Sequence, residues 1–221
     1  IFNPFPNFGL GMRRLQTTFS PARSAGSDPD FDDEAQKIFA LLGASKSTGR
    51  YNPCDPIWKH PTSGGTIFVG NVEAASNMGV LQKHGITYVV NCTDNMPMYH
   101  ARTGEITYIQ FDIASWSRYV RGGHDSFYSF TKPMFNFVGE AISSGHNVLV
   151  HCLAGAHRAG TTGCLLLMHF ASLEARKAIV LAKRLRPVID PIGSLPDLLH
   201  KAEAANQANP PRTRFPTTHF E

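Results

Sequence analysis

Residues 148–163 read VLVHCLAGAHRAGTTG, an apolar run that ends in a His-Cys pair and continues into small residues and an arginine. If the run is a strand and a helix follows, the loop between them is suited to bind an anion. Its backbone N–H groups can converge on one point, and the helix N-terminus adds a partial positive charge. Arg158 offers a planar pair of donors that matches two phosphate oxygens. The pattern therefore predicts a site for a phosphate-like anion.

Cys152 stands at the base of this loop, where few bulky side chains could pack around a thiol. The loop dipoles and Arg158 would favour its thiolate, which is a good nucleophile. Gly155 lets the backbone approach an anion closely. The same loop would thus bind a phosphoryl group and activate the group that attacks it.

His151, Cys152, Gly155 and Arg158 match the HCxxGxxR signature of the cysteine-based protein tyrosine phosphatases. From about Thr66 onward the chain is similar to the dual-specificity branch of that superfamily. The resemblance implies that Cys152 attacks phosphorus to form a phosphocysteine, that an acid protonates the leaving oxygen, and that water then hydrolyses the intermediate. It also implies that Arg158 holds the phosphoryl oxygens, that His151 supports the loop, and that no metal or organic cofactor is needed. By the same resemblance, six consecutive residues would supply the N–H groups of the cradle and bind substrate: Leu153, Ala154, Gly155, Ala156, His157 and Arg158.

The sequence departs from the family pattern at two positions. Ala159 stands where relatives carry Ser or Thr, so we expect slow breakdown of the phosphocysteine. Ser115 stands where relatives carry the acidic Asp. Asp112 and Asp125 are the two nearby candidates for the catalytic acid; the remaining alternatives are a third group and no dedicated acid at all. Asp112 could instead be a solvated strand residue, and Asp125 could instead be the N-cap of the following helix.

Four cysteines, Cys54, Cys92, Cys152 and Cys164, form no CxxC pair and show no zinc-site spacing. We expect no metal site and a reduced, intracellular and most simply cytoplasmic setting. The Arg- and Ser-containing N-terminus leaves organelle import as an alternative. Cys92 should end a strand beside that of Cys152. By analogy with some relatives it could trap Cys152 in a disulfide, or it could be an inert buried thiol.

Apolar and polar stretches alternate in a way that predicts strands followed by helices. The predicted strands are 66–70, 86–92, 106–113 and 147–152, and the predicted helices are 28–43, 72–84, 125–143, 158–171, 173–186 and 194–206, with loops at 44–65 and 114–124. Pro133 should kink the 125–143 helix or mark its first turn. This order predicts an α/β fold, dual-specificity-phosphatase-like, with a central, mostly parallel sheet flanked by helices and an N-terminal extension. The expected organisation is an N-terminal arm with a short helix (1–50), a phosphatase domain (51–206) and a tail (207–221).

Charge and composition narrow the choice of partner. The net charge of +4 favours an anionic partner, and no apolar run is long enough to span a membrane. Five basic residues in 173–186 could form a solvated face or meet an acidic partner. The cradle lacks lysine, which favours phosphorylated protein over lipid or nucleic acid. We expect a phosphatase acting on phosphotyrosine and on phosphoserine or phosphothreonine. The alternatives are a weakly active phosphate-binding pseudophosphatase and a glucan, lipid or RNA phosphatase, and the oligomeric state stays open.

Overall fold

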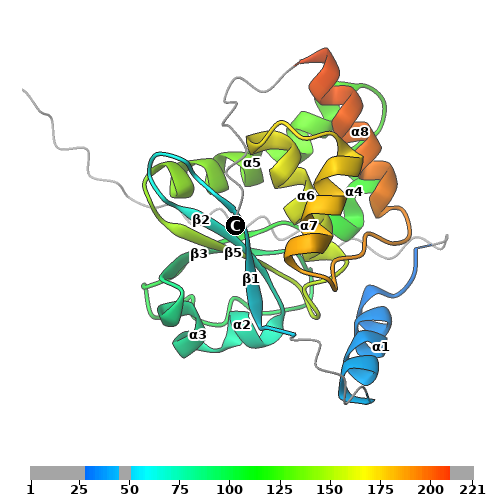
Figure 1. Cartoon of the computed structure of the whole chain (residues 1–221). Coiled ribbons are helices and arrows are strands. Elements are labelled where there is room, and N and C mark those ends of the chain that lie inside the picture. The colour runs from blue at the N-terminus through cyan, green and yellow to red at the C-terminus, as the bar shows by residue number, and fades with distance from the viewer. Residues whose placement is uncertain (1–27, 45–50, 210–221) are drawn as a thin grey trace, which may run out of the picture.

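A computed structural model describes residues 28–44 and 51–209 (Figure 1). Within these residues five strands form one sheet in the order β1-β2-β5-β3-β4. The strands are β1 (Cys54–Lys59), β2 (Thr66–Gly70), β3 (Ile86–Asn91), β4 (Thr107–Gln110) and β5 (Asn147–His151). β1 runs antiparallel to β2, and the remaining neighbours are parallel. The expected α/β fold with a mostly parallel sheet is confirmed.

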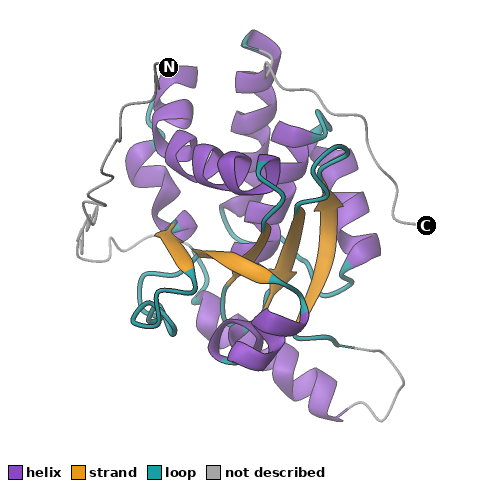
Figure 2. Ribbon diagram, turned by 90° about the vertical axis from the view of Figure 1, so that its left-hand side faces the viewer, coloured by secondary structure: helices purple, strands orange, loops and turns teal. Residues whose placement is uncertain are grey.

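Helices cover both faces of the sheet (Figures 1 and 2). They are α1 (Phe31–Ala44), α2 (Val72–Ser76), α3 (Met78–Lys83), α4 (Trp116–Tyr119), α5 (His124–Ser143), α6 (Arg158–Phe170), α7 (Ala175–Leu185) and α8 (Leu195–Ala208), with a 3-10 turn at Ile113–Ser115. Helices α2 and α3 pack on one face, and α5 and α6 pack on the other. None of the helices in the described part of the chain is long and apolar enough to cross a membrane.

The alternation of side chains along the strands divides the interior into two cores. In β2, Ile67 and Val69 belong to the larger core with α5, α6 and α8, whereas Phe68 belongs to the smaller core with α2 and α3. In β5, Val150 faces the larger core and Leu149 the smaller one. Strand β5 is therefore buried on both faces and paired on both edges. This makes it a rigid support for the loop that follows it.

Strand β1 lies inside the segment 44–65 that the sequence predicted as loop, so that prediction was wrong for 54–59. Pro56 and the charged residues on either side hid the strand. An edge strand tolerates proline because one of its sides has no ladder partner. The pairing with β2 shifts register between Pro56 and Trp58. Trp58 is nevertheless buried and stacks on Phe170, which fixes the strand to α6.

Several predicted boundaries also differ from the structure. The predicted 72–84 helix is broken at Asn77, which ends α2 and caps α3 with its side chain. The predicted 106–113 strand ends at Gln110, and the predicted 114–124 loop contains α4. Pro133 lies inside α5 rather than in its first turn. The extended arm predicted over 1–27 and most of the predicted tail lie outside the described residues.

Candidate active site

The predicted anion loop joins β5 to α6 at the carboxyl end of the central strand. We call residues 153–158 the cradle loop. Gly155 has φ +65°, and a Cβ placed there would lie 2.4 Å from the carbonyl oxygen of Gly70. An L side chain would meet both a strained backbone and a clash, so this position requires glycine. The glycine therefore lets the cradle loop fold against the end of β2.

Cys152 directly follows β5, and Arg158 is the first residue of α6. Both are buried, with 3% and 4% of their surface exposed. The Arg158 guanidinium forms an ion pair with the Asp32 carboxylate of α1, and its Cζ lies 5.8 Å from the centre of the Phe31 ring. The fold thus places the cysteine and the arginine at the two ends of one short loop. The contact with α1 was not foreseen from the sequence.

Arg186 supports the cradle loop from behind, and the sequence analysis missed it. Its Nε donates to the Gly155 carbonyl at 3.0 Å and its Nη2 to the Ala154 carbonyl at 3.3 Å. Its Nη1 pairs with Asp55 Oδ2 at 2.5 Å and also donates to the Asn52 carbonyl at 3.0 Å. In a trans peptide the C=O and the following N–H point in opposite directions. Arg186 therefore turns the N–H groups that follow these two carbonyls away from itself.

The solvated-face interpretation of the basic helix is consequently wrong for Arg186, which is only 1% exposed. Arg186 directly follows α7 as its C-cap. Tyr51 adds a second support, because its hydroxyl donates to the Ala154 carbonyl at 2.6 Å. The centre of its ring lies 5.1 Å from Cζ of the Arg186 guanidinium. A positive charge and a hydroxyl thus hold the outer side of the loop.

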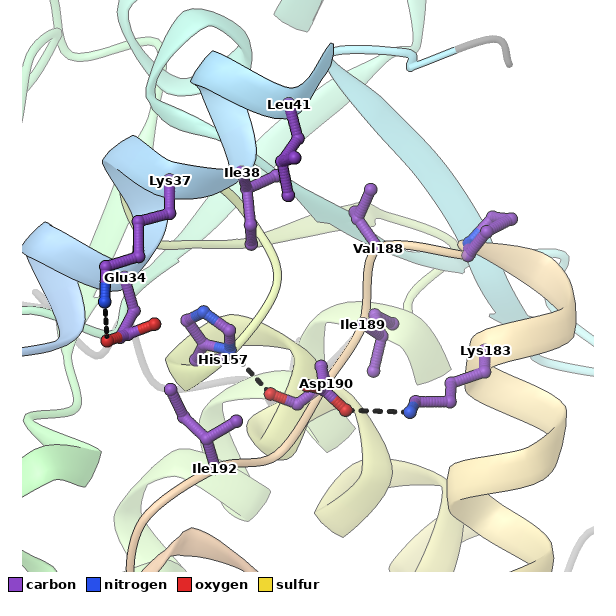
Figure 3. A pocket seen from close by; sticks show the side chains of 11 residues that line it. Glu34, Lys37, Ile38, Leu41, His157, Lys183, Val188, Ile189, Asp190 and Ile192 are labelled. Carbon is purple, nitrogen blue, oxygen red and sulfur yellow. Dashed lines mark hydrogen bonds and ion pairs between the residues drawn. The ribbon is translucent and has the colours of Figure 1, made fainter. Parts of the chain in front are cut away.

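A pocket of about 480 Å³ opens beside the cradle loop, between α1 and residues 187–192 (Figure 3). His157 lies at its base and is 6% exposed, so it does not face solvent. Its Nδ1 lies 2.6 Å from the Asp190 carbonyl oxygen, and the Asp190 N–H donates to the Ala156 carbonyl at 3.2 Å. Residues 187–192 are therefore joined to the cradle loop through its backbone and its histidine.

The chain was compared with known proteins. A family model described as "Dual specificity phosphatase, catalytic domain" matches residues 67–204. The chain belongs to this family. This confirms the resemblance drawn from the HCxxGxxR signature.

Relatives and solved structures agree with this family. Mouse dual specificity protein phosphatase 6 is 28% identical over 216 residues, covering 97% of this chain and 52% of that protein. Human dual specificity protein phosphatase 9 is 32% identical over 189 residues, which cover 85% of this chain and 45% of that protein. The chain spans about half the length of these curated relatives. Two solved structures share the fold. Human DUSP28 has 23% sequence identity and a TM-score of 0.56, and the match covers 73% of this chain and 99% of that one. A mouse putative dual specificity phosphatase complexed with zinc tungstate has 24% identity and a TM-score of 0.56, and the match covers 74% of this chain and 96% of that one.

The two aspartates proposed as the catalytic acid of this dual specificity phosphatase domain lie in different surroundings. Asp112 follows β4, is half-buried and precedes the 3-10 turn, so it is not a solvated strand residue. Asp125 is exposed in the first turn of α5, whose N-cap is Gly123, so it is not the N-cap either. Ser115 is the last residue of the 3-10 turn and the N-cap of α4. None of the three is brought onto the cradle loop by a described hydrogen bond.

The hydroxyls that follow Arg158 are engaged with the helix backbone. Thr161 Oγ1 donates to the His157 carbonyl at 2.7 Å, and Thr162 Oγ1 donates to the Arg158 carbonyl at 3.0 Å. The thiol of Cys92 lies 3.3 Å from Thr162 Oγ1. The pKa of Cys92 is raised, and the largest cause is burial. The hydrogen bond with Thr162 lowers this pKa, whereas the charges of Cys152 and Asp112 raise it further. Cys92 therefore sits under the first turns of α6 as a protonated thiol.

Burial keeps two further cysteines and one histidine neutral. Burial raises the pKa of Cys54 to about 11 and that of Cys164 to about 12. Burial lowers the pKa of His151 to about 4, so its ring is neutral at physiological pH. Among residues 28–44 and 51–209, no group of three or more His, Cys, Asp or Glu side chains is placed to hold a metal ion.

Proposed function

We propose that this chain hydrolyses phosphate monoesters of proteins, on phosphotyrosine and on phosphoserine or phosphothreonine, through a phosphocysteine on Cys152. The observation that carries the proposal is the cradle loop, with Cys152 at its base, Gly155 at φ +65° and Arg158 opening α6. The curated relatives carry the name dual specificity protein phosphatase, and one solved neighbour is described as a complex with tungstate, a tetrahedral oxyanion like phosphate.

In the first step the Cys152 sulfur attacks phosphorus. An S–P bond forms, the P–O bond to the substrate breaks, and the leaving oxygen takes a proton from an acid. The N–H groups of the cradle loop, the N-terminus of α6 and the Arg158 guanidinium would all face the negative charge that develops on the phosphoryl oxygens. In the second step water attacks phosphorus, the S–P bond breaks, and inorganic phosphate and the free thiolate remain.

We assign the acid to Asp112 rather than Asp125. Asp112 lies just beyond the carboxyl end of β4, at the same edge of the parallel sheet as Cys152, and it is half-buried. Asp125 is exposed in the first turn of α5 and does not follow a strand of the sheet. Ligands of such sheets bind at the carboxyl ends of the strands, so Asp112 is the better placed of the two.

The test is hydrolysis of a small aryl phosphate from pH 5 to 8 by the wild type, Cys152→Ser and Cys54→Ser. The good leaving group needs little help from an acid, so the assay reports on nucleophile and cradle. We expect Cys152→Ser to be inactive and Cys54→Ser to keep wild-type rates, since a thiol with a pKa of about 11 is no nucleophile in this range. A folded, reduced wild type without activity would instead support the pseudophosphatase alternative.

A second assay decides the substrate class. Peptides carrying phosphotyrosine, phosphoserine or phosphothreonine are compared with a soluble phosphoinositide, a phosphorylated glucan and an RNA 5′-phosphate. The cradle loop between Cys152 and Arg158 carries no lysine, a residue that would favour lipid or nucleic-acid phosphates. Preference for a non-protein phosphate over all three peptides would refute the protein-substrate part of the proposal.

A further inference from the structure

Helix α1 packs directly on the cradle loop. Ala35 of α1 forms a buried cluster with Ala154 and Ala156, and Ile38 and Phe39 pack around it. Small side chains on both partners allow the helix to come close to the loop. Figure 3 shows α1 crossing above His157 on one side of the pocket. With α1 in this place, Phe31 and Asp32 lie on the Arg158 guanidinium, and Arg158 is 4% exposed.

The contact also places an acid on the phosphate-binding arginine. Asp32 Oδ1 pairs with Arg158 Nη2, and Asp32 Oδ2 accepts a hydrogen bond from Asn95 Nδ2 at 2.9 Å. A carboxylate offers a guanidinium the same planar pair of oxygens that a phosphoryl group offers. The Nη2 hydrogen that Asp32 accepts is not available to a phosphoryl oxygen, and the Asp32 carboxylate also repels the negatively charged phosphoryl group. Asp32 therefore takes a place on Arg158 that a substrate oxygen would need.

Local contacts fix the beginning of α1 in this position. Asp30 caps the helix, its Oδ1 accepting from the Asp32 N–H at 2.9 Å. Asp28 accepts from the Ser194 N–H at 2.6 Å and from its hydroxyl at 2.7 Å, and Ser194 in turn accepts from Trp116 Nε1 at 2.9 Å. The polar anchors are partly exposed, with 31% of the Asp32 side chain accessible, and contacts of this kind are individually weak. The apolar contacts of Phe31 and Ala35 are buried, so they supply most of the free energy that holds α1 in place.

Resting on the proposed function, we infer that α1 is an internal competitor of the substrate: docking of Asp32 on Arg158 closes the phosphate site, and substrate binds only when α1 has moved away. The Phe31 ring beside the guanidinium and Ala35 on the loop close the same site sterically. Affinity for any phosphate-like ligand is then reduced by the fraction of molecules in which α1 is undocked. Anything that lifts α1 activates the enzyme without touching the catalytic residues.

The experiment measures orthovanadate binding and aryl phosphate hydrolysis by the whole 221-residue chain in four forms. These are the wild type, Asp32→Asn, Ala35→Gln and Asp33→Asn. Asp32→Asn removes the competing charge. Ala35→Gln adds bulk at a contact that is 2% exposed, and so undocks the helix without changing its charge. Asp33→Asn is the matched control, because Asp33 carries the same charge in the same turn but is exposed.

We expect Asp32→Asn and Ala35→Gln each to bind vanadate about tenfold more tightly than the wild type, with KM for the aryl phosphate falling in parallel. Asp33→Asn should stay within about twofold of the wild type. Equal vanadate affinity in the wild type and Asp32→Asn would overturn the inference and leave the proposed function intact. An equal gain in Asp33→Asn would also overturn it, because it would reveal a general charge effect. Failure of every form, undocked variants included, to bind vanadate would overturn the proposed function itself.

Discussion

Replacing Arg186 by methionine should disturb the cradle loop, although Arg186 does not itself contact the substrate. The side chain is 1% exposed and donates to three backbone carbonyls as well as to Asp55. Methionine fills a similar volume but donates no hydrogen bond. Breaking a buried pair by removing one partner costs about 3–5 kcal/mol, because the other partner and its acceptors stay buried. For a domain of this size that corresponds to a fall in Tm of roughly 6–20 °C.

Thermal unfolding and activity together test this reasoning. At temperatures below the Tm of the variant, folded Arg186→Met still carries the Cys152 nucleophile. Its kcat should nevertheless be about 100-fold lower than that of the wild type, which is the effect of misplacing one oxyanion donor. Arg186→Lys should fall between the two, since a point charge can meet Asp55 but cannot replace the planar fork. Arg184→Met is the matched control, because Arg184 is exposed on α7 and should change stability by less than about 0.5 kcal/mol. Equal Tm and equal kcat for Arg186→Met and Arg184→Met would refute the support role.

Other predictions follow from the same geometry. Asp112→Asn should lower turnover of alkyl phosphates by about 100-fold while aryl phosphates change little, and Asp125→Asn should leave both rates unchanged; the opposite pattern would move the acid to Asp125. If phosphocysteine breakdown is slow, the wild type should show a burst of product with an aryl phosphate. Ala159→Ser should then raise the steady-state rate about tenfold, because the serine hydroxyl can donate a hydrogen bond to the departing sulfur. An unchanged burst in this variant would exclude that role. Burial lowers the pKa of His169 from 6.5 to about 4, so the unfolded chain binds a proton that the folded chain does not, and stability present above pH 6.5 is lost as pH falls toward 4. The free energy of unfolding of the wild type should therefore fall between about pH 7 and pH 5. In His169→Phe, which can keep the stacking on Phe135, this fall should be smaller by about 1–2 kcal/mol when measured by urea titration. The same fall in both proteins would contradict the shifted pKa of His169.

The central part of the site could be predicted from the sequence because the residues that indicate it are close together in the chain. Cys152, Gly155 and Arg158 lie within one loop, and each residue type has a distinct physical reason to be there. The strands on either side were also predictable, since β2, β3 and β5 are short apolar runs rich in β-branched residues. These apolar runs were sufficient to place the three strands.

The parts that could not be predicted depend on contacts between distant residues. Asp32 and Arg158 are 126 residues apart, and Arg186 and Asp55 are 131 apart. Arg186 lies in a strongly basic segment, so its burial left no local sign in the sequence. Strand β1 was missed because an edge strand needs neither a continuous apolar run nor a complete ladder.

The central position of β5 also bears on how this chain folds. β5 lies between β2 and β3, and both partners precede it by a long stretch of chain; Thr66 and Asn147, which share a hydrogen bond, are 81 residues apart. Closing so long a loop costs entropy before the new pairing compensates for it, which makes such parallel sheets slow to form. During synthesis β2 and β3 emerge first and present unpaired edges until β5 is available. The strand that supports Cys152 thus completes the sheet, and a nascent chain exposes strand edges that can aggregate until that strand is in place.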